Sequence, residues 1–333
     1  MVRAASRPRR GTQLLVLEVP SAVARIHAIG DLPGLLRPGD LVVLNDAATL
    51  PASFPGVFEG APVELRLAGL RDDRTFDAVL FGAGSFRHRT EDRPAPPIVA
   101  AGPVIRLDGG LEARVGSVSQ LSPRLVAVDF GLPEERLWPA LYAAGRPIQY
   151  SYHVVAVALA AVQTLAAGRP WSFEPPSAAL PLTSTLLAGL RARGVRVATV
   201  AHAAGLSATG DPAIDAALPF PERFELPEAT VRAIQETRAS GGRVVAIGTT
   251  VVRALEGSGL RSGTGVTDLK LGASSRLAVV DAVLTGVHER GVSHYELLRA
   301  FAPDRLLEKG AALAEEAGFL AHEFGDSCLV LAA

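Results

Sequence analysis

The sequence predicts an α/β protein with a helix-covered, largely parallel sheet and a separate, small all-β region. Its 333 residues exceed the size that one hydrophobic core usually serves, so two domains are expected. With 48% hydrophobic and 20% charged residues, the chain has the composition of a folded globular protein. The local pattern of residues also changes twice along the chain, and each change indicates a different kind of structure.

The first fifty residues contain two runs typical of buried strands. These are residues 14–19 (Leu-Leu-Val-Leu-Glu-Val) and 40–44 (Asp-Leu-Val-Val-Leu), and an Arg-Pro-Gly turn at 37–39 leads into the second. From about residue 52 to about residue 145, short alternating segments such as 63–67 are separated by Gly, Pro and Asp. This spacing predicts a small all-β barrel or sandwich.

The second half of the chain alternates between helix and strand patterns. Residues 186–193 predict a helix, Gly194 ends it, and residues 195–200 predict a strand. A second unit of helix and strand spans 227–247, and a third begins with a strand at 277–284. This alternation is typical of a largely parallel sheet covered by helices. The all-β region is either inserted into one α/β domain or placed in tandem with it, and periodicity does not choose between them.

Composition excludes several classes of protein. Lys and Arg number 33 against 34 Asp and Glu, a net charge of −1, so any RNA contact has to be local. The single cysteine, Cys328, excludes an intramolecular disulfide and a cysteine-based structural zinc site, and its apolar neighbours predict a buried structural thiol. Residues 1–10 lack the apolar run of a secretory signal, and no apolar run is long enough to span a membrane. We therefore expect a soluble cytoplasmic protein.

The most informative local pattern is Ile-Gly-Thr-Thr-Val-Val-Arg-Ala-Leu-Glu at residues 247–256. A buried strand ends at Gly248 and a helix begins with Thr249 and Thr250, so free backbone N–H groups point beyond the strand's carboxyl end. Ligands bind at this position in open α/β sheets. Arg253, one turn into the helix, is suited to a ligand carboxylate or phosphate. The competing interpretation is a helix cap at Thr249 and a solvated surface arginine.

Candidates for proton transfer accompany two other predicted strands. Strand alternation puts Asp281 and Thr285 on one face, and His288 lies in the following loop, where reactive groups are common. Histidine suits proton transfer near neutral pH. Asn45 and Asp46 follow the second N-terminal strand. The alternatives are that Asp281 accepts only backbone hydrogen bonds, that His288 is solvated, and that the Asx pair forms a turn.

Two weaker candidates also lie at strand ends. His202 follows the strand at 195–200, and Asp326 precedes the last strand. The chain has no P-loop, no metal-ligand spacing such as His-Glu-x-x-His and no Gly-x-Ser-x-Gly elbow. The sequence therefore argues against ATP-dependent, zinc-dependent and serine-hydrolase chemistry.

Several blocks occur in a specific order along the chain. They are residues 35–46, residues 242–253, Val-Asp at 280–281 with Leu-Thr at 284–285 and His288, and Phe-Gly-Asp at 324–326. Together these blocks resemble the S-adenosylmethionine:tRNA ribosyltransferase-isomerases of queuosine biosynthesis. The similarity runs from about residue 12 to the end, and Gly-Thr-Thr-x-x-Arg at 248–253 is its most specific part.

The resemblance implies an α/β domain of residues 1–51 and 146–333, sheet-like or barrel-like, into which a β-barrel of residues 52–145 is inserted. It implies S-adenosylmethionine as co-substrate, without a metal. The ribosyl moiety is transferred to the aminomethyl group of a 7-deazaguanine in tRNA, adenine and methionine leave, and the ribose becomes an epoxycyclopentane. The residues expected to bind S-adenosylmethionine are Gly248, Thr249, Thr250 and Arg253, and those expected to transfer protons are Asp46, Asp281 and His288.

Several side chains typical of the family are replaced. Its Asn-Asp-Thr-Arg becomes Asn-Asp-Ala-Ala, ending at Ala48, and its Pro-Ala-Arg becomes Pro-Ala-Ser, ending at Ser53. Pro181 replaces a histidine within residues 176–182, and Phe-Pro-Glu, ending at Glu222, replaces His-Ser-Glu. The lost cations weaken tRNA binding. Two alternatives therefore stay open, namely a paralog that uses S-adenosylmethionine on a small acceptor and a catalytically silent binding protein.

Overall fold

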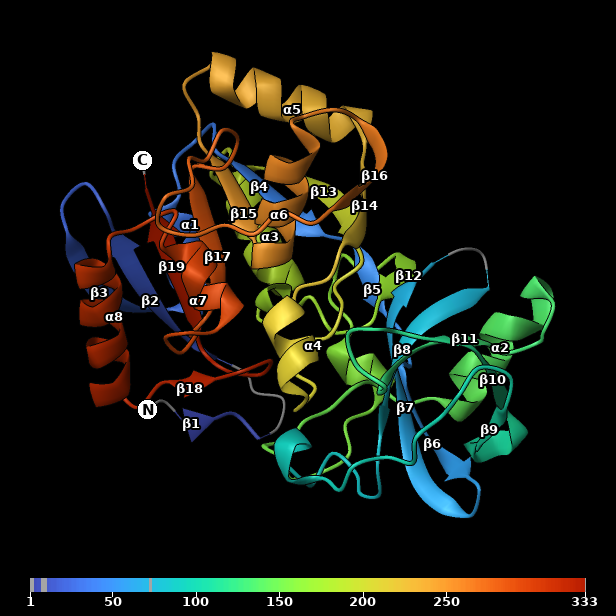
Figure 1. The fold of residues 1–333 in the computed structure, drawn as a ribbon. Coiled ribbons are helices and arrows are strands. Elements are labelled where there is room, and N and C mark those ends of the chain that lie inside the picture. The colour runs from blue at the N-terminus through green and yellow to red at the C-terminus, as the bar shows by residue number, and fades with distance from the viewer. Residues whose placement is uncertain (1–2, 7–10, 72–73, 333) are drawn as a thin grey trace.

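The computed structural model describes residues 3–6, 11–71 and 74–332, which form an α/β domain beside a β-barrel (Figure 1). Part of the arginine-rich stretch at 1–10 lies outside the described residues. Among the described residues, no helix has the length and apolar character needed to cross a membrane.

A nine-stranded sheet forms the centre of the α/β domain. In order across the sheet, from one outermost strand to the other, the strands are β16 (Gly263–Thr267), β14 (Glu222–Leu226), β13 (Arg196–His202), β4 (Leu41–Asn45), β15 (Val244–Ile247), β17 (Ala282–Gly286), β19 (Ser327–Leu331), β2 (Gln13–Glu18) and β3 (Val23–Ala28). The four central strands β13, β4, β15 and β17 run parallel, so their carboxyl ends meet at one edge. We call this the carboxyl edge, and the opposite one the amino edge.

Strand alternation divides the hydrophobic core between the two faces of the sheet. In β4, Leu41 and Val43 join the cluster that includes α5, α6, α7 and α8, whereas Val42 and Leu44 join the one that includes α1 and α3. The helices of the domain are α1 (Leu32–Leu35), α3 (Ser184–Ala192), α4 (Pro212–Ala217), α5 (Glu228–Ala239), α6 (Thr249–Ser258), α7 (Ser293–Leu298) and α8 (Asp304–Glu316). Burial on both faces explains why the central strands are continuous apolar runs.

The second unit is a closed barrel of six antiparallel strands. In order around the barrel they are β10 (Glu112–Val118), β11 (Leu125–Asp129), β8 (Thr75–Phe81), β7 (Ala61–Leu70), β6 (Ser53–Phe58) and β9 (Val104–Leu107). The helix α2 (Glu134–Ala144) packs on its core through Leu137 and Leu141. All six strands fall within the predicted range 52–145, while the domain boundaries themselves stay a prediction.

Two short parallel pairs complete the fold. They are β5 (Ala47–Thr49) with β12 (Arg169–Ser172), and β1 (Arg3–Ala4) with β18 (Leu320–Ala321). Cys328 is buried in β19 without a disulfide, as predicted, and burial raises the pKa of its thiol to about 12. The thiol therefore stays protonated at neutral pH and packs as a small hydrophobe.

The α/β architecture and the barrel are confirmed, and the structure refines two details. The sheet is mixed, with four parallel and four antiparallel neighbouring pairs, because β14, β19 and β2 run opposite to the four central strands, whereas β16 and β3 run in the same direction as them. The strand expected at 277–284 begins only at Ala282. The Glu256 carboxylate accepts hydrogen bonds from the backbone N–H groups at 278–280, so this tertiary contact replaces strand pairing there.

Candidate functional site

The carboxyl edge of the parallel strands gathers many of the predicted polar residues. Asn45 is the last residue of β4 and is fully buried. Its side-chain carbonyl accepts hydrogen bonds from His202 N and Ala47 N, both at 3.0 Å, and its amide donates to His202 O at 2.9 Å. The Asn45 side chain therefore joins the ends of β4 and β13, and it holds in place the edge from which the other candidate residues project.

The turn from β15 into α6 depends on Gly248. Its φ of 101° lies in a region that L side chains rarely adopt, and a Cβ there would lie 3.5 Å from Ala178 Cβ. Gly248 occupies the N-cap position of α6, and no side chain of the described residues caps the helix. The interpretation of Thr249 as a helix cap is therefore wrong, and the first N–H groups of α6 keep their capacity to bind an anion.

Arg253 is buried in the interior beneath this turn. It is 6% exposed, its Nε donates to Leu269 O at 2.9 Å, and its Nη1 donates to the Glu222 carboxylate. Its Nη2 is buried and has no hydrogen-bond partner in the described part of the chain. The interpretation of Arg253 as a solvated surface cation is therefore wrong. A buried guanidinium with an open donor is a suitable group for a ligand anion.

Glu222 and His202 complete the surroundings of Arg253. Glu222 Oε1 accepts a hydrogen bond from Gly205 N at 2.7 Å, and His202 Nε2 lies 3.3 Å from Glu222 Oε2. Burial raises the pKa of Glu222, and Arg253 opposes that shift. Burial, with a contribution from Arg253, lowers the pKa of His202 to about 3. His202 is therefore a neutral imidazole at pH 7, and both its ring nitrogens lack a hydrogen-bond partner among the described residues.

Asp46 directly follows Asn45 at the same edge. Its backbone N–H donates to Val200 O at 3.0 Å, and its carbonyl accepts from Gly168 N at 2.8 Å, so the backbone is held on both sides. The Asp46 Oδ1 atom is buried and unpartnered within the described residues. A fixed backbone with an open carboxylate oxygen fits a role in accepting a proton or a hydrogen bond from a ligand.

His288 follows β17 and is held by two contacts. Its Nε2 lies 2.7 Å from Thr285 Oγ1, and its ring stacks on His294, with 4.8 Å between the centroids. Burial, together with nearby His294 and His322, lowers the pKa of His288 well below its usual value. His288 is therefore a neutral base at physiological pH and not a solvated cation. The sequence offered no sign of His294, because only the stacking reveals its place.

The structure does not bring every predicted residue into this group. Asp281 lies just before β17 at the amino edge, where its Oδ2 accepts a hydrogen bond from Val244 N at 2.8 Å. The alternative that it accepts backbone hydrogen bonds describes it correctly. Asp326 precedes β19 and accepts from Gln13 N and Leu320 N, both at 2.7 Å. These two carboxylates hold backbone groups in place.

The positions at which the family's side chains are replaced also have definite surroundings. Ser53 donates to the buried Glu64 carboxylate at 2.8 Å, and Arg66 and Arg93 pair with the same carboxylate. Guanidinium groups are therefore present beside Ser53 even though that position carries no arginine. Pro181 follows the short helix η5 (Ser177–Ala179), whose Ala178 lies close to Gly248.

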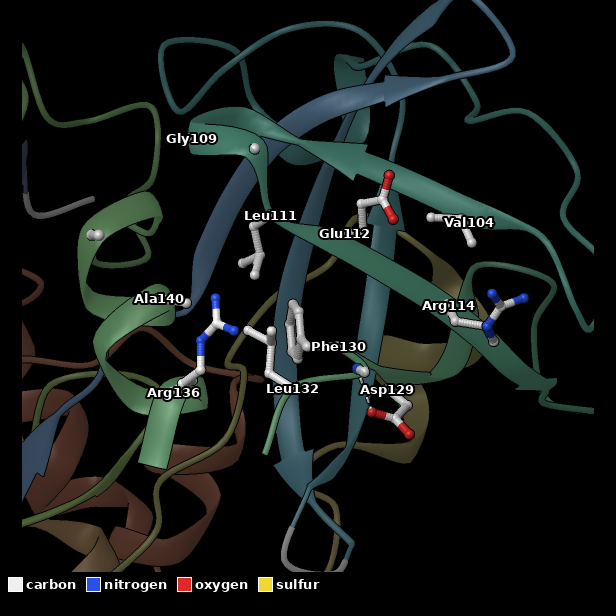
Figure 2. A pocket seen from close by; sticks show the side chains of 13 residues that line it. Val104, Gly109, Leu111, Glu112, Arg114, Asp129, Phe130, Leu132, Arg136 and Ala140 are labelled. Atoms are coloured by element: carbon white, nitrogen blue, oxygen red, sulfur yellow. Dashed lines mark hydrogen bonds between the residues drawn. The ribbon is translucent and has the colours of Figure 1, made fainter. Parts of the chain in front are cut away.

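Two cavities lie near or within the barrel. Figure 2 shows one of about 490 Å³ between the barrel and α2, lined by Glu112, Arg114, Asp129 and Arg136 among others. These charged side chains are exposed, so solvent satisfies them. A smaller cavity of about 80 Å³ lies between the barrel and the α/β domain and reaches Glu222. The buried, incompletely paired groups are at the carboxyl edge, and we place the candidate site there.

No group of three or more His, Cys, Asp or Glu side chains within residues 3–6, 11–71 and 74–332 is arranged to hold a metal ion. The edge instead offers a guanidinium, helix N–H groups, a carboxylate and neutral imidazoles. These groups can bind a ligand carboxylate and exchange protons.

Comparison with known proteins agrees with the blocks found in the sequence. The family model described as queuosine biosynthesis protein matches residues 1–330. The S-adenosylmethionine:tRNA ribosyltransferase-isomerase of Anaeromyxobacter sp. (strain K) is 34% identical over 336 residues, covering 97% of this chain and 93% of that protein. The Gloeobacter violaceus enzyme of the same name is also 34% identical, with 97% and 90% covered.

A solved structure is similar along the whole chain. The S-adenosylmethionine tRNA ribosyltransferase of Thermotoga maritima aligns with a TM-score of 0.53 at 23% identity, covering 98% of this chain and 96% of that one. This likeness supports the fold. Because the family model and the curated relatives both match almost the whole chain, it belongs to the queuosine biosynthesis protein family of S-adenosylmethionine:tRNA ribosyltransferase-isomerases.

Proposed function

We propose that the protein transfers the ribosyl moiety of S-adenosylmethionine to the 7-aminomethyl-7-deazaguanine of a tRNA and isomerises it to an epoxycyclopentane. The observation that carries this proposal is the buried Arg253, whose Nη2 has no hydrogen-bond partner among the described residues and which lies in the first turns of α6. Relatives that are 34% identical along almost the whole chain carry the name of this reaction.

The methionyl carboxylate is the part of S-adenosylmethionine that suits this corner. Arg253 offers an open donor, and the first N–H groups of α6 add the positive end of a helix dipole. Glu222 and Leu269 O hold the guanidinium in one orientation, so little side-chain entropy is lost on binding. Gly248 keeps the helix start free of a Cβ, which lets a ligand approach the backbone closely.

Proton transfer falls to groups beside this corner. The acceptor amine must lose a proton before it can attack carbon, and the departing adenine must gain one. His288 is neutral at pH 7, although its lowered pKa makes it a weak proton acceptor, and Asp46 has a carboxylate oxygen without a hydrogen-bond partner among the described residues. We do not assign this role to Asp281, whose carboxylate accepts a hydrogen bond from Val244 N at the amino edge.

A small-molecule amine is the second candidate acceptor. Pro181 stands where the family has a histidine, and Ala48 and Ser53 stand where it has arginines, which reduces both proton-transfer and phosphate-binding capacity. The donor site at Arg253 is the same under both candidates.

The test is release of adenine from S-adenosylmethionine by the purified protein. We expect release with tRNA that carries 7-aminomethyl-7-deazaguanine and none with the same tRNA carrying guanine. Release with small amines alone would transfer the proposal to the second candidate. The absence of release with every acceptor, together with no heat of S-adenosylmethionine binding, would leave a silent protein and overturn the proposed function.

A further inference from the structure

A second group of unusual side chains comes from two segments, the loop before β19 and the segment between α2 and β12. We call Tyr152, His153, His322 and Glu323 the Tyr152 cluster. Asp326 fixes the loop, because its carboxylate accepts hydrogen bonds from two backbone N–H groups and its own N–H donates to Leu320 O at 2.7 Å. These hydrogen bonds of Asp326 hold His322 and Glu323 in one defined arrangement, which gives the Phe-Gly-Asp block a structural role.

The cluster offers a flat aromatic surface. The rings of Tyr152 and His322 stack with 4.1 Å between their centroids and 17° between their planes. Tyr150 stacks on Tyr152 with 5.9 Å between centroids, so the pair is supported by a buried ring. His322 is exposed. A supported and accessible aromatic pair is the kind of surface on which nucleic-acid bases stack.

Glu323 is a carboxylate without a cationic partner among the described residues. Its side chain is 15% exposed, and both its oxygens lie 2.6 Å from the Tyr152 hydroxyl, which donates to them. Burial raises the pKa of Glu323 to about 7. His153 Nε2 lies 3.8 Å from Glu323 Oε2, and burial, with a contribution from His322, lowers the pKa of His153 to about 4, so it is neutral. The site therefore has a place for a positive charge.

His153 supplies an independent sign that a ligand belongs there. It is 4% exposed, and neither ring nitrogen has a hydrogen-bond partner in the part of the chain that the structure describes. Tyr152 packs on its ring at 4.7 Å and Phe324 at 5.5 Å, so the imidazole is held in place while its nitrogens stay open. Buried polar atoms left without partners are uncommon in proteins, and they often mark a binding site or an unseen molecule.

The cluster is close to the candidate site. His322 is one of the two neighbours that affect His288, and His288 follows the carboxyl end of β17. The first residue of β19, Ser327, pairs with Gly286 at that same end. A ligand on the Tyr152 cluster would thus lie on the His288 side of the edge, while Arg253 lies beneath the neighbouring strand end.

We propose that the Tyr152 cluster is the acceptor subsite, where a heteroaromatic base stacks on the exposed ring of His322, which Tyr152 supports, and Glu323 binds the primary ammonium of its aminomethyl group. The inference rests on the proposed function and names the residues that recognise its acceptor. His153 adds a hydrogen bond to the same ligand. The chemistry is an ammonium on a flat base, whether that base is part of an RNA or free.

The test compares equilibrium binding of two RNA stem-loops that differ at one base, 7-aminomethyl-7-deazaguanine or guanine. Wild-type protein should prefer the aminomethyl RNA. In Glu323→Gln this preference should fall at least about tenfold, because a charge-assisted hydrogen bond is lost. In His322→Ala both RNAs should bind less tightly, because stacking serves either base. The free base 7-aminomethyl-7-deazaguanine, titrated in the same way, shows whether the RNA is needed.

Glu289→Gln is the matched control, since it removes a nearby exposed carboxylate and should keep the preference. If the wild type prefers the aminomethyl RNA and Glu323→Gln keeps the full preference, the subsite is wrong while the proposed function stands. If the wild type shows no preference and releases no adenine, both are wrong. Retained heat of S-adenosylmethionine binding in Glu323→Gln confirms that the variant is folded.

Discussion

Polar side chains at the two edges of the central sheet differ in whether they have hydrogen-bond partners. At the amino edge, the Asp40 carboxylate accepts from Arg37 N at 2.8 Å and pairs with Arg243 at 2.7 Å, and Asp281 accepts from Val244 N. At the carboxyl edge, Asp46 Oδ1, Arg253 Nη2 and both His202 ring nitrogens are buried without partners, as far as the described residues extend.

The difference indicates which edge serves stability and which serves binding. An unsatisfied buried polar group costs about 1 to 3 kcal/mol, so several of them at one edge would be lost from a chain selected for stability alone. Folded proteins retain such groups at functional sites. The amino edge thus holds the strands together, and the carboxyl edge keeps its donors and acceptors for a ligand.

The largest effect is expected at Arg253. Arg253→Lys keeps a cation beside Glu222, so the protein should fold, but it removes the open Nη2 donor. We expect the kcat/KM of adenine release, with S-adenosylmethionine as the varied substrate, to fall by about 100-fold. An unchanged kcat/KM in a folded Arg253→Lys protein would contradict the distinction between the edges.

A change at the amino edge should affect only stability. Asp281→Ala removes the acceptor for Val244 N, and we expect the free energy of unfolding in urea to fall by about 1 to 3 kcal/mol. The kcat/KM of adenine release should stay within about twofold of wild type. A large loss of activity at full stability would instead support proton transfer by Asp281.

A pH-dependent gain in stability is expected at Glu323. Its folded-state pKa of about 7 lies above its usual value of 4.5, so between these pH values the folded chain binds more protons than the unfolded chain. Stability contributed by that proton is therefore lost as pH rises through 7. Glu323→Gln should exceed wild type in unfolding free energy by about 1 to 3 kcal/mol at pH 8 and by much less at pH 5.

The control for this prediction is Glu289→Gln, because Glu289 is exposed. Its unfolding free energy should follow that of wild type at both pH values. A gain in Glu323→Gln that is equal at pH 5 and pH 8 would mean that the carboxylate is not destabilised by burial. The burial of the Glu323 carboxylate would then be no sign of a binding role.

The sequence predicted the parts of the fold that depend on local patterns. Apolar runs located β4 and β15, Gly and Pro spacing located the barrel, and the Gly-Thr-Thr-x-x-Arg block located the turn at Gly248. Each of these signals lies within a few neighbouring residues. The direction of the outer strands is a property of chain connection, so periodicity could not show that the sheet is mixed.

The rest of the site depends on contacts between distant segments. Tyr152 and Glu323 are 171 positions apart in the sequence. The partner of Arg253 is Glu222, on a short strand whose pattern is hard to recognise in the sequence because prolines flank it. The apolar residues at 277–280 predict a strand that includes Asp281, but the Glu256 carboxylate binds their backbone N–H groups instead. The burial of the His202 side chain and of the Asp46 Oδ1 atom likewise arises only when the chain folds.

The most direct measurement is a crystal structure of the protein with S-adenosylmethionine bound. If the carboxyl edge is the donor site, the methionyl carboxylate will lie about 3 Å from Arg253 Nη2 and close to the first N–H groups of α6. S-adenosylmethionine bound instead in the cavity between the barrel and α2, with Arg253 unchanged, would contradict the assignment of the site.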